Sequence, residues 1–183
     1  MNVIEGILSS IKDLSKRVGR LETQEHRHPH EVLITAATIT LDAGTSGNAV
    51  ADLRTAHDAL YYTITEAAAT PGIRLTVHFT SVKNFTRVKI IGYYKGSSTH
   101  SVGIQLYNWA TAHWDTYNAM QTAVGDIATH DEIILDNPSF QVSSCTSYVG
   151  TGANLGKVDV RFNHTMSGSA NHSLSLDVVA LVK

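Results

Sequence analysis

The sequence has 183 residues, of which 43% are hydrophobic, and its 14 Lys and Arg against 16 Asp and Glu give a formal net charge of -2. Such a chain has enough apolar side chains to fill the core of one ordinary domain of about 150 residues behind a short helix. Because nucleic acids and anionic membranes are bound through an excess of positive charge, neither is expected as a partner.

The first predicted element is an amphipathic helix over residues 1–25. Its apolar residues recur at alternating steps of three and four, which are the a and d positions of a heptad repeat. These positions are Ile4, Ile7, Ile11, Leu14, Val18 and Leu21. Arg17 then lies at g and Glu22 at e, where opposite charges pair between neighbouring helices. The pattern predicts a trimerisation coiled coil. A dimer and a monomer whose helix packs on its own domain are the alternatives.

The segment Arg17-Val18-Gly19-Arg20-Leu21-Glu22 resembles the short trimerisation signature of coiled coils, in which Arg precedes an apolar a residue and Glu follows an apolar d residue. The resemblance implies a homotrimer. It does not explain Gly19, which costs a helix about 1 kcal/mol relative to Ala.

Residues 26–47 are predicted to form a neck and a lead-in strand. His26, His28 and His30 alternate around Pro29, which stops a helix at this point. Alternate residues of an extended segment point to one side, so three chains on a common axis would bring these imidazoles together around a transition metal. The spacing resembles the metal-binding His-x-His segments of some phage tail tips. A polar neck without metal is the alternative, and no other cofactor is expected.

From Val32 onward the apolar period changes to two, which is typical of antiparallel strands with one buried face. The clearest alternating runs start at Ile73, Val102, Val158 and Leu174. In the last run the polar residues are expected on the outer face: Ser173, Ser175 and Asp177. Further strands are predicted at 60–66, 87–94, 114–118, 132–135 and 140–143. The strand number predicts a mainly β domain over residues 48–183, an antiparallel jelly-roll-like β-sandwich.

Two segments of this domain are similar to each other. Gly96–Ile104 and Gly168–Leu176 both consist of a polar turn, a histidine and a strand. The histidines, His100 and His172, could hydrogen-bond the carbonyl groups of their loops, because small polar residues at both places suit hairpin tips. In the other interpretation, the two histidines lie at one edge of the sandwich and present their side chains to a ligand.

Both tryptophans of the chain lie close together in the sequence. Tyr107 and Trp109 share the strand face opposite the apolar residues, and Trp114 is followed by Asp115. Aromatic rings beside polar side chains suit sugars, whose C–H faces pack on the rings while their hydroxyl groups find hydrogen-bond partners. The same residues would suit a subunit interface or the core, so both interpretations stay open.

Motifs of enzyme chemistry are missing from the sequence. There is no Gly-x-Ser-x-Gly, no Walker loop and no His-Glu-x-x-His. Two adjacent pairs have acid–base potential, His57-Asp58 and Asp131-Glu132, and a turn cap and a solvated strand entry explain them better. The lone Cys145 excludes an intramolecular disulfide. We therefore expect a protein that is not an enzyme, although carboxylates that cleave sugars need only be close in space.

Parts of the β domain resemble a sandwich module found in bacteriophage structural proteins, including tail-fibre and minor virion components. These parts are Tyr61–Glu66, Pro71–Arg74, Gly103–Asn108 with Trp114-Asp115, and Val160–His164 with His172–Asp177. The resemblance spans residues 48–182. A short coiled coil that leads into a compact β domain is likewise similar to trimeric phage fibre and capsid-decoration proteins.

The resemblance implies a place on the virion surface. With no signal peptide and no run of about 18 apolar residues, synthesis in the host cytoplasm is expected. The expected partners are two further copies of the chain, other virion proteins and a host surface glycan, which a homotrimer would bind with avidity. The alternative is a capsid-decoration protein at a three-fold axis. A polysaccharide-cleaving enzyme is the less favoured third possibility.

Overall fold

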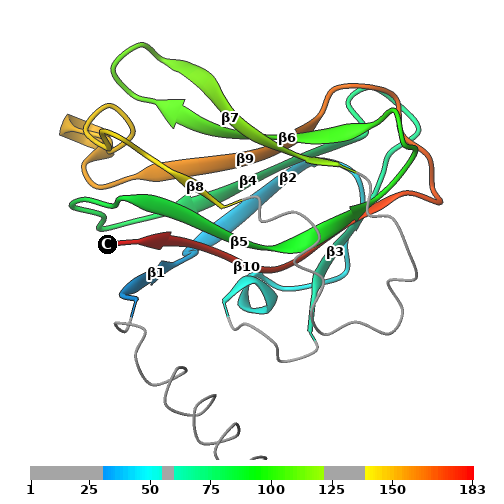
Figure 1. Ribbon diagram of the computed structural model, residues 1–183, viewed down its shortest axis with the longest axis horizontal. Coiled ribbons are helices and arrows are strands. Elements are labelled where there is room, and N and C mark those ends of the chain that lie inside the picture. The colour runs from blue at the N-terminus through cyan, green and yellow to red at the C-terminus, as the bar shows by residue number, and fades with distance from the viewer. Residues whose placement is uncertain (1–30, 55–59, 122–138) are drawn as a thin grey trace, which may run out of the picture. The chain divides into compact units, whose positions relative to one another are not determined.

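The computed structural model describes residues 31–54, 60–121 and 139–183, which form two antiparallel β-sheets facing each other across a common core (Figure 1). Residues Leu33–Lys183 belong to one compact unit. The mainly β, antiparallel fold class is thereby confirmed. The predicted coiled coil of residues 1–25 and the predicted strand at 132–135 lie outside the described residues. The same holds for His26, His28 and His30 of the neck and for the pairs His57-Asp58 and Asp131-Glu132.

The first sheet is built around its longest strand, β10 (Ser173–Val182). On one side β10 pairs along its length with β5 (Arg87–Lys95). On the other side it pairs with β3 (Tyr62–Thr65) near its start and with β1 (Leu33–Thr35) near its end. The short strand β8 (Phe140–Gln141) extends the sheet beyond β5.

The second sheet has the order β2-β4-β9-β6-β7, and neighbouring strands are antiparallel throughout. Its strands are β2 (Thr38–Ala43), β4 (Ile73–Phe79), β9 (Val158–His164), β6 (Ser101–Asn108) and β7 (His113–Gln121). A hairpin joins β6 to β7, and its tip lies at the left-hand end of the sandwich in Figure 1. The lead-in segment predicted at 26–47 therefore supplies a strand to each sheet, β1 to the first and β2 to the second.

The core lies between the sheets, where the predicted alternation is confirmed in β6 and, except at the buried Thr76, in β4. Leu75, Phe162 and Ile104 are fully buried and form one row across the second sheet, because Phe162 pairs with Leu75 on one side and Ile104 on the other. Burial of a side chain of this size stabilises the fold by about 1.5–3 kcal/mol. Residues with the opposite phase, such as Arg74 and Gln105, point away from this core and are half-buried.

The prediction for β10 was wrong in one respect, because Ser175 and Asp177 are not on an exposed face. Both are buried, at 2% and 1% exposure. The reason is a second layer over the strand: the 3-10 helix η1 (Val50–Leu53) packs against β10. The hydroxyl of Ser175 is satisfied by that of Thr63, 3.0 Å away, and a β-bulge between Leu176 and Val178 shifts the register at Asp177. An alternating sequence pattern can therefore belong to a strand that is covered on both faces.

Several predicted strands differ in length from the observed ones. The segment predicted at 60–66 contains the shorter strand β3, Tyr62–Thr65. The segment predicted at 114–118 is the middle of the nine-residue β7, which continues because it pairs with β6 along its whole length. The segment predicted at 140–143 contains only two strand residues, since β8 pairs with β5 over Arg87 and Val88 alone. Within the described part of the chain, no helix has the length and apolar character needed to cross a membrane.

Candidate functional site

The side chains that the sequence singled out as ligand-binding fall into two groups at opposite ends of β6. His100 directly precedes the strand, and Tyr107 lies near its other end. Seven residues at about 3.3 Å each place the two positions roughly 23 Å apart. We call Tyr107, Trp109 and Trp114 the aromatic cluster. We call Glu66, Tyr94, His100, His164 and His172 the His–Glu cluster.

The aromatic cluster forms where β6 and β7 meet at their hairpin. Tyr107 lies opposite Trp114 in the ladder of the two strands, and their ring centroids are 5.1 Å apart. Trp109 follows β6 and approaches Tyr107 to 4.8 Å. Both ring pairs are edge-on, a favourable arrangement for aromatic quadrupoles, and all three residues are half-buried. The cluster thus combines a packed interior with an accessible side.

Asn108 stabilises the tip of this hairpin. Its Oδ1 accepts hydrogen bonds from the backbone N–H groups of Ala110 and Thr111, at 3.1 and 3.2 Å. Its Nδ2 donates to Oδ2 of Asp115 at 2.9 Å. A short polar side chain that bonds backbone groups two and three residues ahead is a usual way to hold a turn. The turn residues and Asp115 are therefore positioned by one side chain.

Asp115 is the most connected polar residue beside the aromatic cluster. Its Oδ2 also accepts a hydrogen bond from the Tyr148 hydroxyl at 2.8 Å, and Nε2 of the exposed His113 lies 2.6 Å from its Oδ1. The bonds from Asn108 and Tyr148, followed by the contact with His113, lower the pKa of Asp115. Burial raises the pKa of Tyr148, and its bonds with Tyr117 and Asp115 raise it further. Asp115 is thus a fixed carboxylate and a hydrogen-bond acceptor.

A guanidinium group lies over one ring of the aromatic cluster, on the outer face of the second sheet. The Arg161 Cζ is 4.0 Å from the centre of the Trp114 ring, a cation–π contact. Its Nε donates to Oε1 of Gln105 at 2.8 Å, and Gln105 in turn donates to the Thr116 hydroxyl at 3.0 Å. Burial lowers the pKa of Arg161, and the nearby charge of Arg74 lowers it further. Two positive side chains therefore lie close together on this face.

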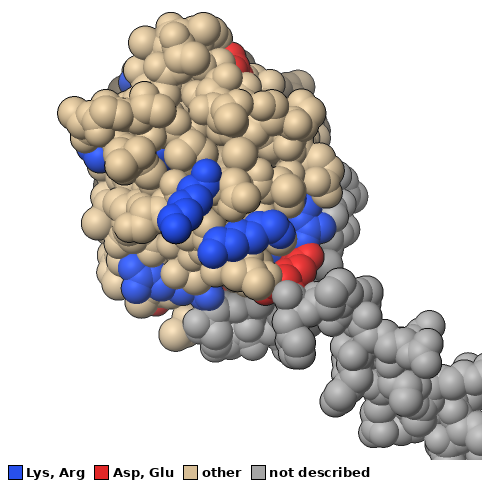
Figure 2. Space-filling model, turned by 90° about the vertical axis from the view of Figure 1, so that its left-hand side faces the viewer, with Lys and Arg blue, Asp and Glu red and all other residues tan. Residues whose placement is uncertain are grey.

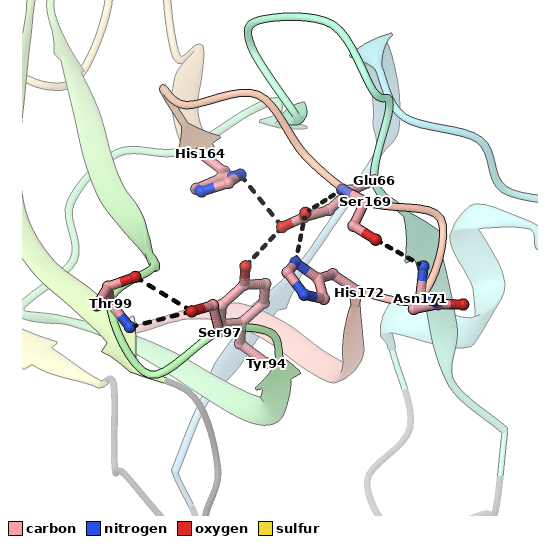
Figure 3. Close-up of polar contacts among 8 residues, drawn as sticks. All are labelled: Glu66, Tyr94, Ser97, Thr99, His164, Ser169, Asn171 and His172. Carbon is pink, nitrogen blue, oxygen red and sulfur yellow. Dashed lines mark hydrogen bonds and ion pairs between the residues drawn. The ribbon is translucent and has the colours of Figure 1, made fainter.

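The His–Glu cluster is assembled from strand ends at the other end of β6. Glu66 directly follows β3, His164 is the last residue of β9, and His172 directly precedes β10. The backbone ties these ends together, because the Glu66 N–H donates to the carbonyl of His172 at 3.1 Å. Tyr94 of β5 points into the same space (Figure 3). The cluster therefore joins segments that are far apart in the chain.

Glu66 is the centre of this cluster, and its side chain is fully buried. Its Oε1 accepts a hydrogen bond from the Tyr94 hydroxyl at 2.6 Å (Figure 3). Its Oε2 faces the backbone N–H of Ser169 and Nδ1 of His172, each at 3.0 Å. Burial raises the pKa of Tyr94, and the carboxylate of Glu66 raises it further because the two negative forms would repel. Three donors thus fix both carboxylate oxygens.

His164 and His100 complete the cluster. Their ring centroids are 4.8 Å apart, and His164 is 1% exposed. Nδ1 of His164 lies 3.1 Å from Glu66 Oε1, but the geometry is not that of a hydrogen bond. Among the described residues, neither ring nitrogen of His164 and not Nδ1 of His100 has a hydrogen-bond partner. Burial lowers the pKa of His164, an effect that His100 and His172 reinforce and Glu66 opposes.

Some residues of both the aromatic cluster and the His–Glu cluster were predicted from the sequence as ligand-binding residues. His100 and His172 were singled out and do lie together, with ring centroids 5.5 Å apart, but His172 contacts the Glu66 carboxylate and not a loop carbonyl. Glu66 and His164 were not recognised as site residues. A signal was present, since Glu66 keeps the phase of the buried Tyr62 and Ile64, and His164 keeps that of Val160 and Phe162. A charged residue in phase with a buried face requires partners.

Arg161 and Gln105 were also missed beside the aromatic cluster. Both occupy polar positions of alternating strands, which normally face solvent and carry no further signal. Their proximity follows from strand pairing, because Arg161 lies opposite Gln105 in the β9–β6 ladder. Comparison of the chain with protein-family models, with curated protein sequences and with solved structures found no significant match.

Proposed function

We propose that this chain is a non-enzymatic surface protein of a bacteriophage virion that binds an acidic glycan of the host surface through the outer face of its second sheet. The observation that carries the proposal is the Arg161 guanidinium, whose Cζ lies 4.0 Å from the centre of the Trp114 ring, next to Tyr107. A sugar packs its C–H face on aromatic rings, and a carboxylate on that sugar accepts hydrogen bonds from a guanidinium.

The charges around Arg161 favour an acidic sugar over a neutral one. Burial lowers the pKa of Arg161, repulsion by the guanidinium group of Arg74 lowers it further, and the carboxylate of Asp42 opposes this effect. An anion bound between the guanidinium groups would relieve the repulsion. The adjacent end of the sandwich supports this view, because Lys and Arg side chains cross the middle and lower part of the surface in Figure 2, with few Asp or Glu visible.

The strand order supports the jelly-roll arrangement that belongs to this proposal. Eight strands form two four-stranded layers, β3-β10-β5-β8 and β4-β9-β6-β7, to which β1 and β2 are added. Double-sheet jelly rolls of eight strands are the architecture of many viral capsid and lectin domains. Such domains combine a role in a particle with recognition of sugars.

Trimerisation through residues 1–25 is the second part of the proposal. Three sandwiches held together would convert a weak contact with one sugar into stable attachment, provided that the spacing of the sites matches the target. Light scattering of the full chain at micromolar concentration tests this part. A trimer mass is expected, and a monomer mass would overturn it.

The glycan proposal is tested by binding of the full chain to an array of bacterial surface polysaccharides, acidic and neutral. We expect binding to an acidic polymer, and about 10-fold or greater weakening in Arg161→Gln, because hydrogen bonds to charged groups contribute about 1.5–3 kcal/mol. Lys95→Gln removes the same charge from an exposed position at the end of β5, beside the His–Glu cluster and away from Arg161, and should bind as the original chain does. Binding to no polymer, or equal binding by Arg161→Gln, would overturn the proposal. Co-sedimentation with purified capsids without any glycan binding would replace it by capsid decoration.

A further inference from the structure

We propose that Glu66, His100 and His164 bind one divalent transition-metal ion between the two sheets. The inference does not depend on the glycan proposal, since it concerns the other end of β6 and a different set of side chains. The three residues each offer one ligand atom, and these atoms lie within 4.8 Å of one another. The proposed ligands are also different residues from the histidines of the predicted neck.

The hydrogen-bonding state of the two histidines points to a cation. Both ring nitrogens of His164 and Nδ1 of His100 are buried and make no hydrogen bond to the described part of the chain. Each buried polar group without a partner costs about 1–3 kcal/mol. Nδ1 of His164 is only 3.1 Å from Glu66 Oε1, yet the two atoms do not have the geometry of a hydrogen bond. A nitrogen and an oxygen that converge without a shared proton are placed to share a metal ion.

The ligand types narrow the class of ion. Two imidazole nitrogens and one carboxylate oxygen suit Zn²⁺ and its first-row neighbours, whereas Mg²⁺ and Ca²⁺ prefer oxygen ligands alone. Ligand atoms around a tetrahedral ion at about 2.0–2.1 Å are roughly 3.4 Å apart. The three atoms lie within 4.8 Å of one another, so closure requires a shift of at most roughly 1.4 Å. His100 can supply it because it is half-buried and precedes β6 in a loop.

The surroundings of Glu66 match those of a metal-binding carboxylate. Tyr94 and the backbone N–H of Ser169 hold the two oxygens, and His172 contacts Oε2, so the carboxylate cannot rotate freely. Metal ligands are commonly oriented by such outer partners, whose loss weakens metal binding about 10–100-fold. We assign His172 to this positioning role. A bound cation would also neutralise the buried negative charge, which is costly without a positive partner.

Close backbone packing keeps the ligands in place. A Cβ atom on Gly72 would lie 2.6 Å from Nδ1 of His164, and one on Gly168 would lie 2.7 Å from Oε2 of Glu66. The backbone at Gly72 and Gly168 therefore passes close against both ligands, and neither position has room for a Cβ atom. Ligands whose orientation is fixed by packing form a preorganised site.

The experiment uses the full chain with His26, His28 and His30 replaced by Gln, so that a metal at the neck cannot contribute. After treatment with EDTA and its removal, Zn²⁺ is titrated by calorimetry and the bound metal is counted by elemental analysis. We expect one Zn²⁺ per chain and a higher melting temperature with Zn²⁺ than without. Absence of Zn²⁺ binding by this folded protein would overturn the proposal.

Single variants in the same background identify the ligands. His100→Gln is expected to weaken Zn²⁺ binding by about 100-fold or more, and His172→Gln by about 10–100-fold because its role is indirect. His113→Gln removes an imidazole of 57% exposure at the other end of β6 and should leave binding unchanged. Equal Zn²⁺ affinity in His100→Gln and His113→Gln would overturn the assignment. If His100→Gln does not fold, the visible absorption of the Co²⁺-loaded parent decides: a spectrum of nitrogen and oxygen ligands supports the site, and its absence overturns it.

Discussion

Replacing Tyr94 by Phe tests whether the buried carboxylate of Glu66 depends on its hydrogen-bond donors. The ring of Tyr94 is fully buried and remains in place in the variant, so the apolar packing is retained. The change removes one hydroxyl, 2.6 Å from Oε1 of Glu66. Hydrogen bonds to charged groups contribute about 1.5–3 kcal/mol, and we expect the free energy of unfolding to fall by that amount.

The measurement is urea unfolding in the presence of EDTA, which keeps metal from contributing. For a domain of this size about 2–4 °C of melting temperature corresponds to 1 kcal/mol, so a decrease of about 3–12 °C is expected as well. Tyr93→Phe is the matched control on the same strand: Tyr93 is half-buried and packs edge-on against Tyr61 at 5.9 Å. The free energy of unfolding of Tyr93→Phe should fall by less than about 0.5 kcal/mol.

The pH dependence gives the same prediction an independent check. Because the pKa of Tyr94 is raised in the folded state, its contribution is fully present below the pKa of an unfolded tyrosine, about 10. This contribution to stability is lost as the pH rises through the higher pKa that Tyr94 has in the folded state. The difference between the original chain and Tyr94→Phe should therefore shrink only above about pH 10. Equal losses in Tyr94→Phe and Tyr93→Phe at pH 7 would refute the reasoning.

Three further predictions concern the aromatic end, the core and the chain around Glu66. The lowered pKa of Asp115 means that its hydrogen bonds stabilise the fold above the pKa of an unfolded aspartate, about 3.9, and lose this effect as the pH falls through the folded-state value. In urea unfolding, Asp115→Asn should be less stable than the original chain at pH 7 and equally stable near the acid limit. A difference in the free energy of unfolding that does not change with pH would contradict the stabilising role of the ionised Asp115. Phe162→Ala should cost about 3–5 kcal/mol in the same assay, and a loss under about 1 kcal/mol would be inconsistent with its place in the core. Gly168→Ala would bring a Cβ to 2.5 Å from the backbone oxygen of Ala67 and 2.7 Å from Oε2 of Glu66, so we expect the free energy of unfolding to fall by about 1–3 kcal/mol in thermal unfolding. Gly103→Ala, whose nearest contact is 3.5 Å, is the control.

Much of the fold was predictable because alternation of apolar residues reports burial on one face. The strands around Ile73, Val102 and Val158 were found from this pattern, and their inner residues form the core. β10 is a strand for which this alternation indicates the wrong burial. Ser175 and Asp177 alternate with apolar residues as in an exposed strand, but both are buried in a strand against which η1 packs, and contact between segments so far apart cannot be read from local periodicity.

The candidate sites were predictable only in part for a related reason. His100 and His172 stood out because two similar segments carry them, and Trp109 and Trp114 stood out because tryptophan is rare. Glu66 follows β3, and it meets His164 only after β3, β9 and β10 have been brought together by pairing. Strand order and register are thus the missing information, and periodicity within one strand does not contain them.

The central place of β10 in the first sheet has a consequence for biosynthesis. Leu33 near the start of the sandwich pairs with Val182, and β3 and β5 pair with the same strand. At about 5–20 residues per second, a ribosome needs roughly 7–28 s to proceed from β1 to β10. Throughout this interval β1, β3 and β5 lack their common partner, so the nascent chain exposes apolar side chains and unpaired backbone groups. Nascent chains arrested before Ser173 should therefore be digested by protease, whereas chains arrested far enough downstream to release Val182 from the exit tunnel should resist it.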